Sequence, residues 1–130
     1  MAPDVNKEHA IETFKSLIQI SVEGLKLLAV FNGGAAVALL AYLGNVAGKG
    51  LSTPDMRLPM GCYLAGLVSC GLAFAASYLT QLNLYQESVG LSGSGTGRRH
   101  TLWLTVALCL ALTSIGAFAV GSFFAVFRFR

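Results

Sequence analysis

Glu8, His9 and Glu12 place two carboxylates and an imidazole on neighbouring turns of a predicted helix near the start of the chain. Such groups bind metals when another helix supplies a second set of ligands. The only other histidine is His100, and the long uncharged segments contain no Asp or Glu. We therefore expect neither a metal site nor a cofactor in one copy, although a homo-oligomer would multiply these ligands.

The segment 90–97, GLSGSGTG, has the glycine content of a phosphate-binding loop. Those loops follow a strand, open a helix and, in the P-loop, end in Lys-Ser or Lys-Thr. Here Arg98, Arg99 and His100 follow, between two apolar segments. The composition therefore predicts a flexible linker. Arg98 and Arg99 are candidates for contact with anionic lipid headgroups, and the alternative is plain anchoring at the membrane interface.

Catalytic groupings are missing from the sequence. It contains no Ser-His-Asp, Cys-His or paired-carboxylate pattern, and Cys62, Cys70 and Cys109 all fall in apolar segments without a CxxC pair. An odd number of cysteines in this arrangement argues against a disulfide framework or a zinc site. Proton pumps and ion-coupled transporters bury charged groups deep in their spans, and the spans predicted here have no charged residue except Lys26 at the edge of the first. We expect a protein that is not an enzyme.

Three uncharged apolar segments dominate the chain. Of its 130 residues 55% are hydrophobic and 12% are charged, far from the usual soluble domain. Each segment is long enough, at ~1.5 Å per residue, to cross a hydrocarbon layer of ~30 Å. The sequence predicts an all-α membrane protein of one domain, 1–130, with transmembrane helices at 25–48, 58–86 and 101–127.

An amphipathic helix is predicted before the first span, over residues 4–24. Its apolar face comprises Ile11, Phe14, Ile18, Val22 and Leu25, and the polar face opposite comprises Glu8, Glu12, Lys15, Gln19, Glu23 and Lys26. The helix either runs straight into the first span or bends near 21–24 and lies on the bilayer. The mixed charge of the polar face favours packing against protein.

Small residues mark the predicted contacts between helices. The second span has them at every fourth position from Gly61 to Ser77, with a neighbouring track of Cys62, Gly66 and Cys70, and the third span has a similar track from Thr105 to Gly121. Such faces let helix backbones approach closely in lipid. Asn32 is an amide well inside a span and needs a partner on a neighbouring helix or in another copy. The predicted packing or oligomer contacts are Asn32, Gly33, Gly34, Gly61, Ala65, Ser69, Ala73 and Gly121.

The two ends of the spans carry further signals. Thr53, Pro54 and Asp55 form a helix-start pattern, with Thr53 as the cap, before the second span. Two spans separate 4–24 from 80–89, so both segments emerge on one side and are expected to form a protein layer there. Gln81 and Asn83 are the candidate partner contacts in that layer.

Charge gives little information on orientation or on partners outside the membrane. The net charge of +3 is spread along the chain, so we expect no nucleic-acid partner. Lys and Arg are balanced between the two sides of the bilayer, and the positive-inside rule is tied. The hydrophilic N-terminal segment argues against a cleaved signal peptide and favours a cytoplasmic N-terminus.

The stretch 32–45, NGGAAVALLAYLGN, resembles a group of small three-span bacterial membrane proteins that have an N-terminal amphipathic helix and an NGGAA-type first span. The resemblance covers mainly residues 9–45. It implies a multi-pass protein of the bacterial inner membrane and carries over no catalytic residue.

These patterns favour a non-enzymatic membrane protein that acts through helix-helix association. It would be a homo-oligomer or an accessory subunit of a larger membrane complex, with lipids, itself or other membrane subunits as partners. The alternative is an oligomeric pore or a holin-like permeabilising protein, although few polar residues face any single lumen.

Overall fold

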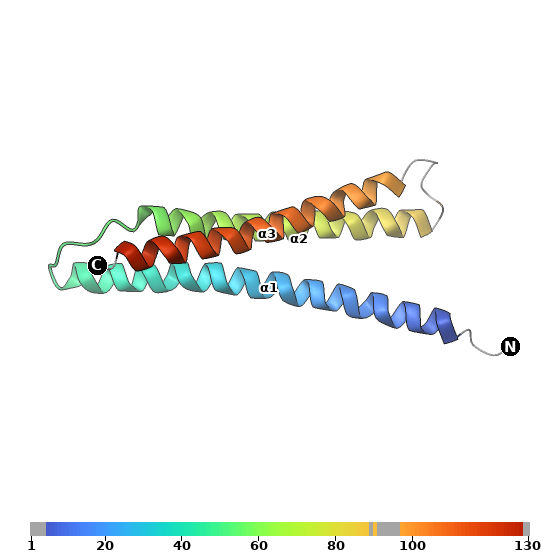
Figure 1. The fold of residues 1–130 in the computed structure, drawn as a ribbon, viewed down its shortest axis with the longest axis horizontal. Coiled ribbons are helices and arrows are strands. Elements are labelled where there is room, and N and C mark those ends of the chain that lie inside the picture. The colour runs from blue at the N-terminus through green and yellow to red at the C-terminus, as the bar shows by residue number, and fades with distance from the viewer. Residues whose placement is uncertain (1–4, 89, 91–96, 129–130) are drawn as a thin grey trace.

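The computed structural model, which describes residues 5–88, 90 and 97–128, consists of three helices joined by two connections (Figure 1). They are α1 (Val5–Gly48), α2 (Arg57–Ser88) and α3 (Gly97–Arg128), and the described residues contain no strand. Lys7–Gly48, Arg57–Glu87 and His100–Arg128 are long and apolar enough to cross a membrane. The prediction of a helical chain with three segments able to span a membrane is confirmed for the described residues, whereas a separate amphipathic helix before the first of them is not seen.

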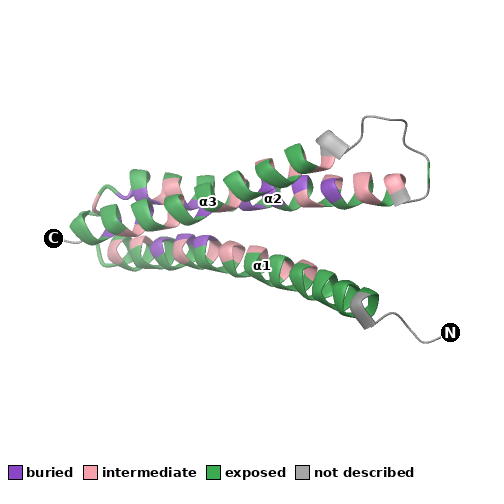
Figure 2. Cartoon of the chain, turned by 45° about the vertical axis from the view of Figure 1, so that its right-hand side comes forward, coloured by how far each residue is buried: buried purple, intermediate pink, exposed green. Residues whose placement is uncertain are grey.

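Helix α1 is continuous, so residues 5–24 run into the first span without a break, which was one of the two alternatives. The helix curves along its length, and its N-terminal part leaves the bundle (Figure 2). On this helix Lys26 Nζ lies 2.8 Å from Oε1 of Glu23, three residues earlier, and the two side chains form an ion pair. At ~1.5 Å per residue the helix is about 66 Å long, roughly twice the thickness of a hydrocarbon layer.

The end of α1 is fixed by Gly50, which has a left-handed backbone with φ 68°. Its N–H donates to Ala47 O at 3.0 Å, and the N–H of Leu51 donates to Val46 O at 3.3 Å. This pair of bonds is the Schellman motif, which satisfies carbonyls that a helix end otherwise leaves free.

Helix α2 begins later than the predicted cap at Thr53 and Pro54. Residues 51–56 have no regular structure, and the carboxylate Oδ1 of Asp55 accepts the N–H of Arg57 at 3.2 Å. Met56, only 2% exposed, is buried just before the helix, and its carbonyl accepts the N–H of Met60 at 3.0 Å. Helix α2 therefore begins directly after the buried Met56, and Asp55, in place of Thr53, takes the capping role.

Helices α2 and α3 lie side by side, and α1 packs on them mainly through its C-terminal half (Figures 1 and 2). A small core joins Ala36 and Leu39 of α1 to Met56 and Tyr63, with Phe118 of α3 packed against it. The ring of Phe118 lies 5.6 Å from that of Phe31 and 6.0 Å from that of Tyr63.

The N-terminal half of α1 diverges from α2 and α3 (Figure 2). Phe14 is 50% exposed and Leu17 is 57% exposed, and an apolar groove of about 410 Å³ separates this part of α1 from the end of α2. The segments predicted to form a protein layer, 4–24 and 80–89, both contribute residues to this groove, and the layer itself stays a prediction.

Candidate functional site

Asn32 lies where all three helices meet, and its side chain is fully buried. Its amide Nδ2 donates to Ser114 Oγ of α3 at 3.1 Å and to Leu28 O of its own helix at 3.1 Å. Its amide oxygen Oδ1 has no hydrogen-bond partner among the described residues. The partner expected for this amide is therefore a neighbouring helix of the same chain, and the hydrogen bond ties α1 to α3.

Gly66 of α2 lies directly against this amide. A Cβ on Gly66 would overlap Asn32 Oδ1, and it would also lie 2.6 Å from Asn32 Cγ. Only a residue without a side chain lets α1 and α2 approach this closely. The sequence placed Gly66 in the second small-residue track without assigning it a contact, and it did not single out Ser114.

A second close approach joins α2 to α3 at Gly121, which the sequence did predict as a contact. A Cβ there would lie 2.9 Å from the ring atom Cε1 of Tyr63 and 3.0 Å from Cβ of Cys62. The hydroxyl of Tyr63 donates to Ser122 Oγ at 3.2 Å. Gly121 and Tyr63 thus hold α3 against α2 on the side of the C-terminus.

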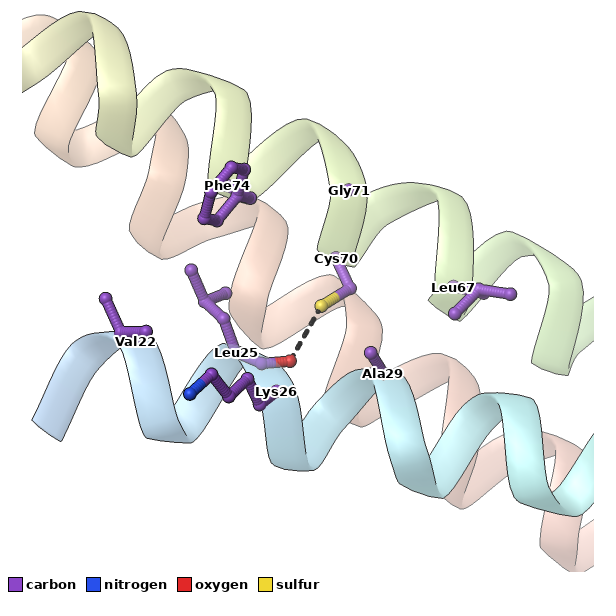
Figure 3. Close-up of a pocket in the computed structure, with 8 residues that line it drawn as sticks. All are labelled: Val22, Leu25, Lys26, Ala29, Leu67, Cys70, Gly71 and Phe74. Carbon is purple, nitrogen blue, oxygen red and sulfur yellow. Dashed lines mark hydrogen bonds between the residues drawn. The ribbon is translucent and has the colours of Figure 1, made fainter. Parts of the chain in front are cut away.

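A third contact joins α1 to α2 nearer the N-terminal side. The thiol of Cys70 donates to Leu25 O at 3.1 Å (Figure 3). It lies at an apolar pocket of about 430 Å³ whose lining also includes Lys26 and Phe74. This contact fixes the level of Leu25 and Lys26 along α2, because it pairs them with Cys70.

The other predicted contact residues divide by burial. Ala73 is buried, Gly33 and Ser69 are half-buried, and Gly34, Gly61 and Ala65 are exposed. No other described part of the chain comes within 4 Å of a Cβ built on Gly33, Gly34 or Gly61. These three glycines therefore serve no close approach within one copy, unlike Gly66 and Gly121.

The every-fourth-residue track does not match the buried face of α2, and helix geometry explains why. A step of four residues turns ~400°, so five such positions drift by about 160° around the helix. The buried residues of α2 are instead three or four positions apart, the spacing that keeps residues on one face of a helix. They are Pro59, Tyr63, Gly66, Cys70, Ala73, Ala76 and Thr80. The same drift leaves Thr105, Cys109 and Thr113 of α3 exposed, while Ala107, Ser114 and Gly121 are buried.

We define the polar flank of α1 as Glu12, Lys15, Gln19, Glu23 and Lys26. Its last residues lie beside a part of α2 that the sequence did not lead us to expect. All five residues are exposed, with the side chains of Glu23 and Lys26 62% and 64% exposed. The first span predicted from the sequence begins at residue 25, which puts Lys26 at the membrane edge. In the structure its neighbour Leu25 contacts Cys70 of α2. Cys70 lies about 13 residues from Arg57 and about 17 from Glu87, the charged residues at the two ends of α2.

A membrane layer placed on the uncharged run of α2 includes this level. The uncharged run of α2 is about 43 Å long, and its ends agree with those of α3, since Glu87 Oε1 lies 3.4 Å from Nδ1 of His100. Every ~30 Å layer that fits between Arg57 and Glu87 includes the level of Cys70. With the layer placed there, the largely exposed side chains of Glu23 and Lys26 lie at the depth of the hydrocarbon.

The candidate partner residues at the far end of α2 are placed in part. Gln81 is exposed and lines the open groove, while Asn83 is half-buried and its Nδ2 donates to Leu79 O at 2.9 Å. Arg98 and Arg99 belong to the first turn of α3, but their side chains lie outside what the structure describes. Most of the glycine-rich linker, 91–96, also lies outside the described residues.

Metal ligands are not gathered in the part of the chain that the structure describes. It contains no group of three or more His, Cys, Asp or Glu side chains with the arrangement of a metal site. Glu8, His9 and Glu12 are exposed on α1. Comparison of the chain with protein-family models, with curated proteins and with solved structures finds no match.

Proposed function

We propose that this protein is a non-enzymatic integral membrane protein that acts through helix-helix association, either as a homo-oligomer or as an accessory subunit of a larger membrane complex. The observation that carries the proposal is the division of the span glycines into two groups. Gly66 and Gly121 meet atoms of neighbouring helices at distances that exclude any side chain, whereas Gly33, Gly34 and Gly61 meet nothing within the copy.

Glycines without such contacts are costly in a helix. Each destabilises the helix by about 1 kcal/mol relative to alanine. Close approach of a further helix, which small residues permit in lipid, is the gain that offsets this cost. Exposed polar side chains at the end of the bundle where the chain begins, among them Gln81 of α2, provide a second contact region for a partner.

The setting we propose is the bacterial inner membrane, on the basis of the resemblance of residues 9–45. The N-terminal half of α1 is proposed to be the amphipathic element of this protein, since its apolar residues face the open groove and its polar flank faces outward. Membrane lipids and other membrane polypeptides are the partners in this proposal, without nucleic acid or a cofactor.

Native mass spectrometry after gentle detergent extraction from the source membrane tests the proposal. Multiple identical copies support a homo-oligomer, and a mass that includes other polypeptides supports the accessory role. A protein that remains monomeric and alone at every concentration, both in membranes and after extraction, would contradict both forms.

An oligomeric pore, or a holin-like protein, is the second candidate. The observation that favours it is the polar flank of α1, which supplies polar side chains at hydrocarbon depth for a lumen. Asn32 does not serve this role, because it is fully buried against α2 and α3. Ion flux from vesicles that contain the pure protein tests the pore. We expect flux that depends on Glu23 and Lys26 if the flank lines it.

A further inference from the structure

We infer that the polar flank of α1 is the contact surface for the same flank of a second copy, packed parallel about a two-fold axis along the membrane normal. This inference rests on the self-association proposed above and names the surface that performs it. Three features carry it: the depth of the flank, the arrangement of its charges, and the glycines that continue it.

Depth creates the need for a partner. Glu23 and Lys26 lie level with the uncharged middle of α2, and their side chains are largely exposed, with Lys26 at the edge of the pocket between α1 and α2. Ionisable side chains at this depth face other protein or water and pair with one another. Glu23 and Lys26 pair with each other, but most of each side chain remains exposed. In a single copy this exposed part would lie against lipid.

The charges of the flank are complementary to themselves. Glu12 and Lys15, like Glu23 and Lys26, are three positions apart and therefore about 60° apart around the helix. The two acids thus form one edge of the flank and the two bases form the other. In a parallel contact about a two-fold axis, the acidic edge of each copy lies against the basic edge of the other, which gives two equivalent sets of ion pairs. The charged e and g positions of parallel coiled coils pair in the same way.

Glycines continue the flank into the uncharged part of α1. Gly33 is seven residues after Lys26, and Gly34 is eleven after Glu23, so each lies within about 20° of the corresponding charged residue around the helix. Gly44 lies on the same side and also has no neighbour within 4 Å of a built Cβ in its own copy. The flank therefore combines charges that pair with glycines that permit close backbone approach.

Charge exchange tests this contact. In lipid nanodiscs or mild detergent, the masses of wild type, Glu23→Lys, Lys26→Glu and the double exchange Glu23→Lys/Lys26→Glu are compared by native mass spectrometry over a range of concentration. We expect a dimer for the wild type, a loss of at least about tenfold in dimer affinity for each single exchange, and recovery in the double exchange. Lys49→Glu, an exposed charge in the first connection, is the matched control and should leave the dimer unchanged.

The outcomes separate this inference from the proposed function. An oligomer that none of these exchanges weakens would overturn the polar-flank contact and leave self-association standing. A wild type that is monomeric under all conditions would overturn both. A larger ring that conducts ions, with ion selectivity altered by the single exchanges, would show that the flank lines water and would overturn the two-fold contact.

Crosslinking in the source membrane provides a second test that does not depend on charge changes or on refolding. The background carries Cys62→Ala, Cys109→Ala and Cys70→Ser, the last of which keeps a donor for Leu25 O. Gln19→Cys, on the flank, should form a disulfide between copies on mild oxidation. Ile20→Cys, 65% exposed at the same depth but about 100° around the helix, is the control, and equal crosslinking of both would contradict the inference.

Discussion

The amide oxygen of Asn32 on α1 lies against the backbone of Gly66 on α2, with no room for a side chain between them. The amide nitrogen of the same residue donates to Ser114 of α3. One buried polar side chain therefore fixes the positions of all three helices. This relationship, and the two other close contacts of the bundle, give predictions that single substitutions can check.

Gly66→Ala should destabilise the bundle, because its Cβ would overlap the Asn32 amide and force α1 away from α2. We expect the free energy of unfolding to fall by about 1–3 kcal/mol. SDS-induced unfolding in mixed micelles, followed by the fluorescence of the single tryptophan, Trp103, measures this. Gly71→Ala is the control, since no neighbour lies within 4 Å of its built Cβ. Asn32→Ala in the Gly66→Ala background should recover part of the loss.

The hydrogen bond between Asn32 and Ser114 should be modest in energy. Interhelical hydrogen bonds in membranes contribute about 0.6 kcal/mol on average and up to about 2 kcal/mol. A double-mutant cycle of Asn32→Ala and Ser114→Ala should therefore give a coupling energy in this range. A coupling energy indistinguishable from zero would mean that the buried amide is not tied to α3 in the membrane.

Gly121→Ala should loosen α3 from α2 at the end near the C-terminus, because its Cβ would lie 2.9 Å from the ring of Tyr63. We expect a loss of about 1–3 kcal/mol in the free energy of unfolding. Gly116→Ala on the same helix has open space around its Cβ and should be neutral or slightly stabilising. Equal effects of the two substitutions would argue that helix propensity, and not contact, determines the result.

Gly33→Ala and Gly44→Ala should have opposite effects on folding and on association. Each is expected to stabilise α1 by up to about 1 kcal/mol, because no neighbour in the same copy opposes a Cβ. Each should also weaken dimerisation, measured by Förster transfer between labelled copies in vesicles. Gly24→Ala, on the opposite side of α1 from Gly33, should stabilise the helix without this loss. Unchanged transfer in all three variants would remove the glycines as evidence for association.

The number and class of the elements could be predicted from the sequence, because they depend on local properties. Runs without charge, longer than a bilayer requires, predict spans wherever they lie in the chain. The pair of Lys26 with Glu23 was predictable for the same reason, since both residues belong to one helix. The Schellman end at Gly50 is also local, since its hydrogen bonds join residues at most five positions apart.

Which small residues pack together was decided by the tertiary structure. Gly61 and Ala65 looked equivalent to Ala73 in sequence, yet only Ala73 is buried, because the helix turns about 100° per residue and one neighbour covers one face. Ser114 was overlooked because its role depends on Asn32, 82 positions away in the chain. No local pattern carries that information.

The position of α1 along the axis of α2 was also set by the tertiary structure. From the sequence alone Lys26 marks the edge of a span, since the uncharged run begins at the next residue. The contacts of Leu25 with Cys70 and of Asn32 with Gly66 define the register of α1 against α2. In this register Lys26 lies beside the middle of the uncharged run of α2. The sequence by itself determined three helices that are long and apolar enough to cross a membrane, together with their charges. Packing between residues distant in the chain decided how deep those charges lie, because the register of two helices depends on which side chains interlock between them.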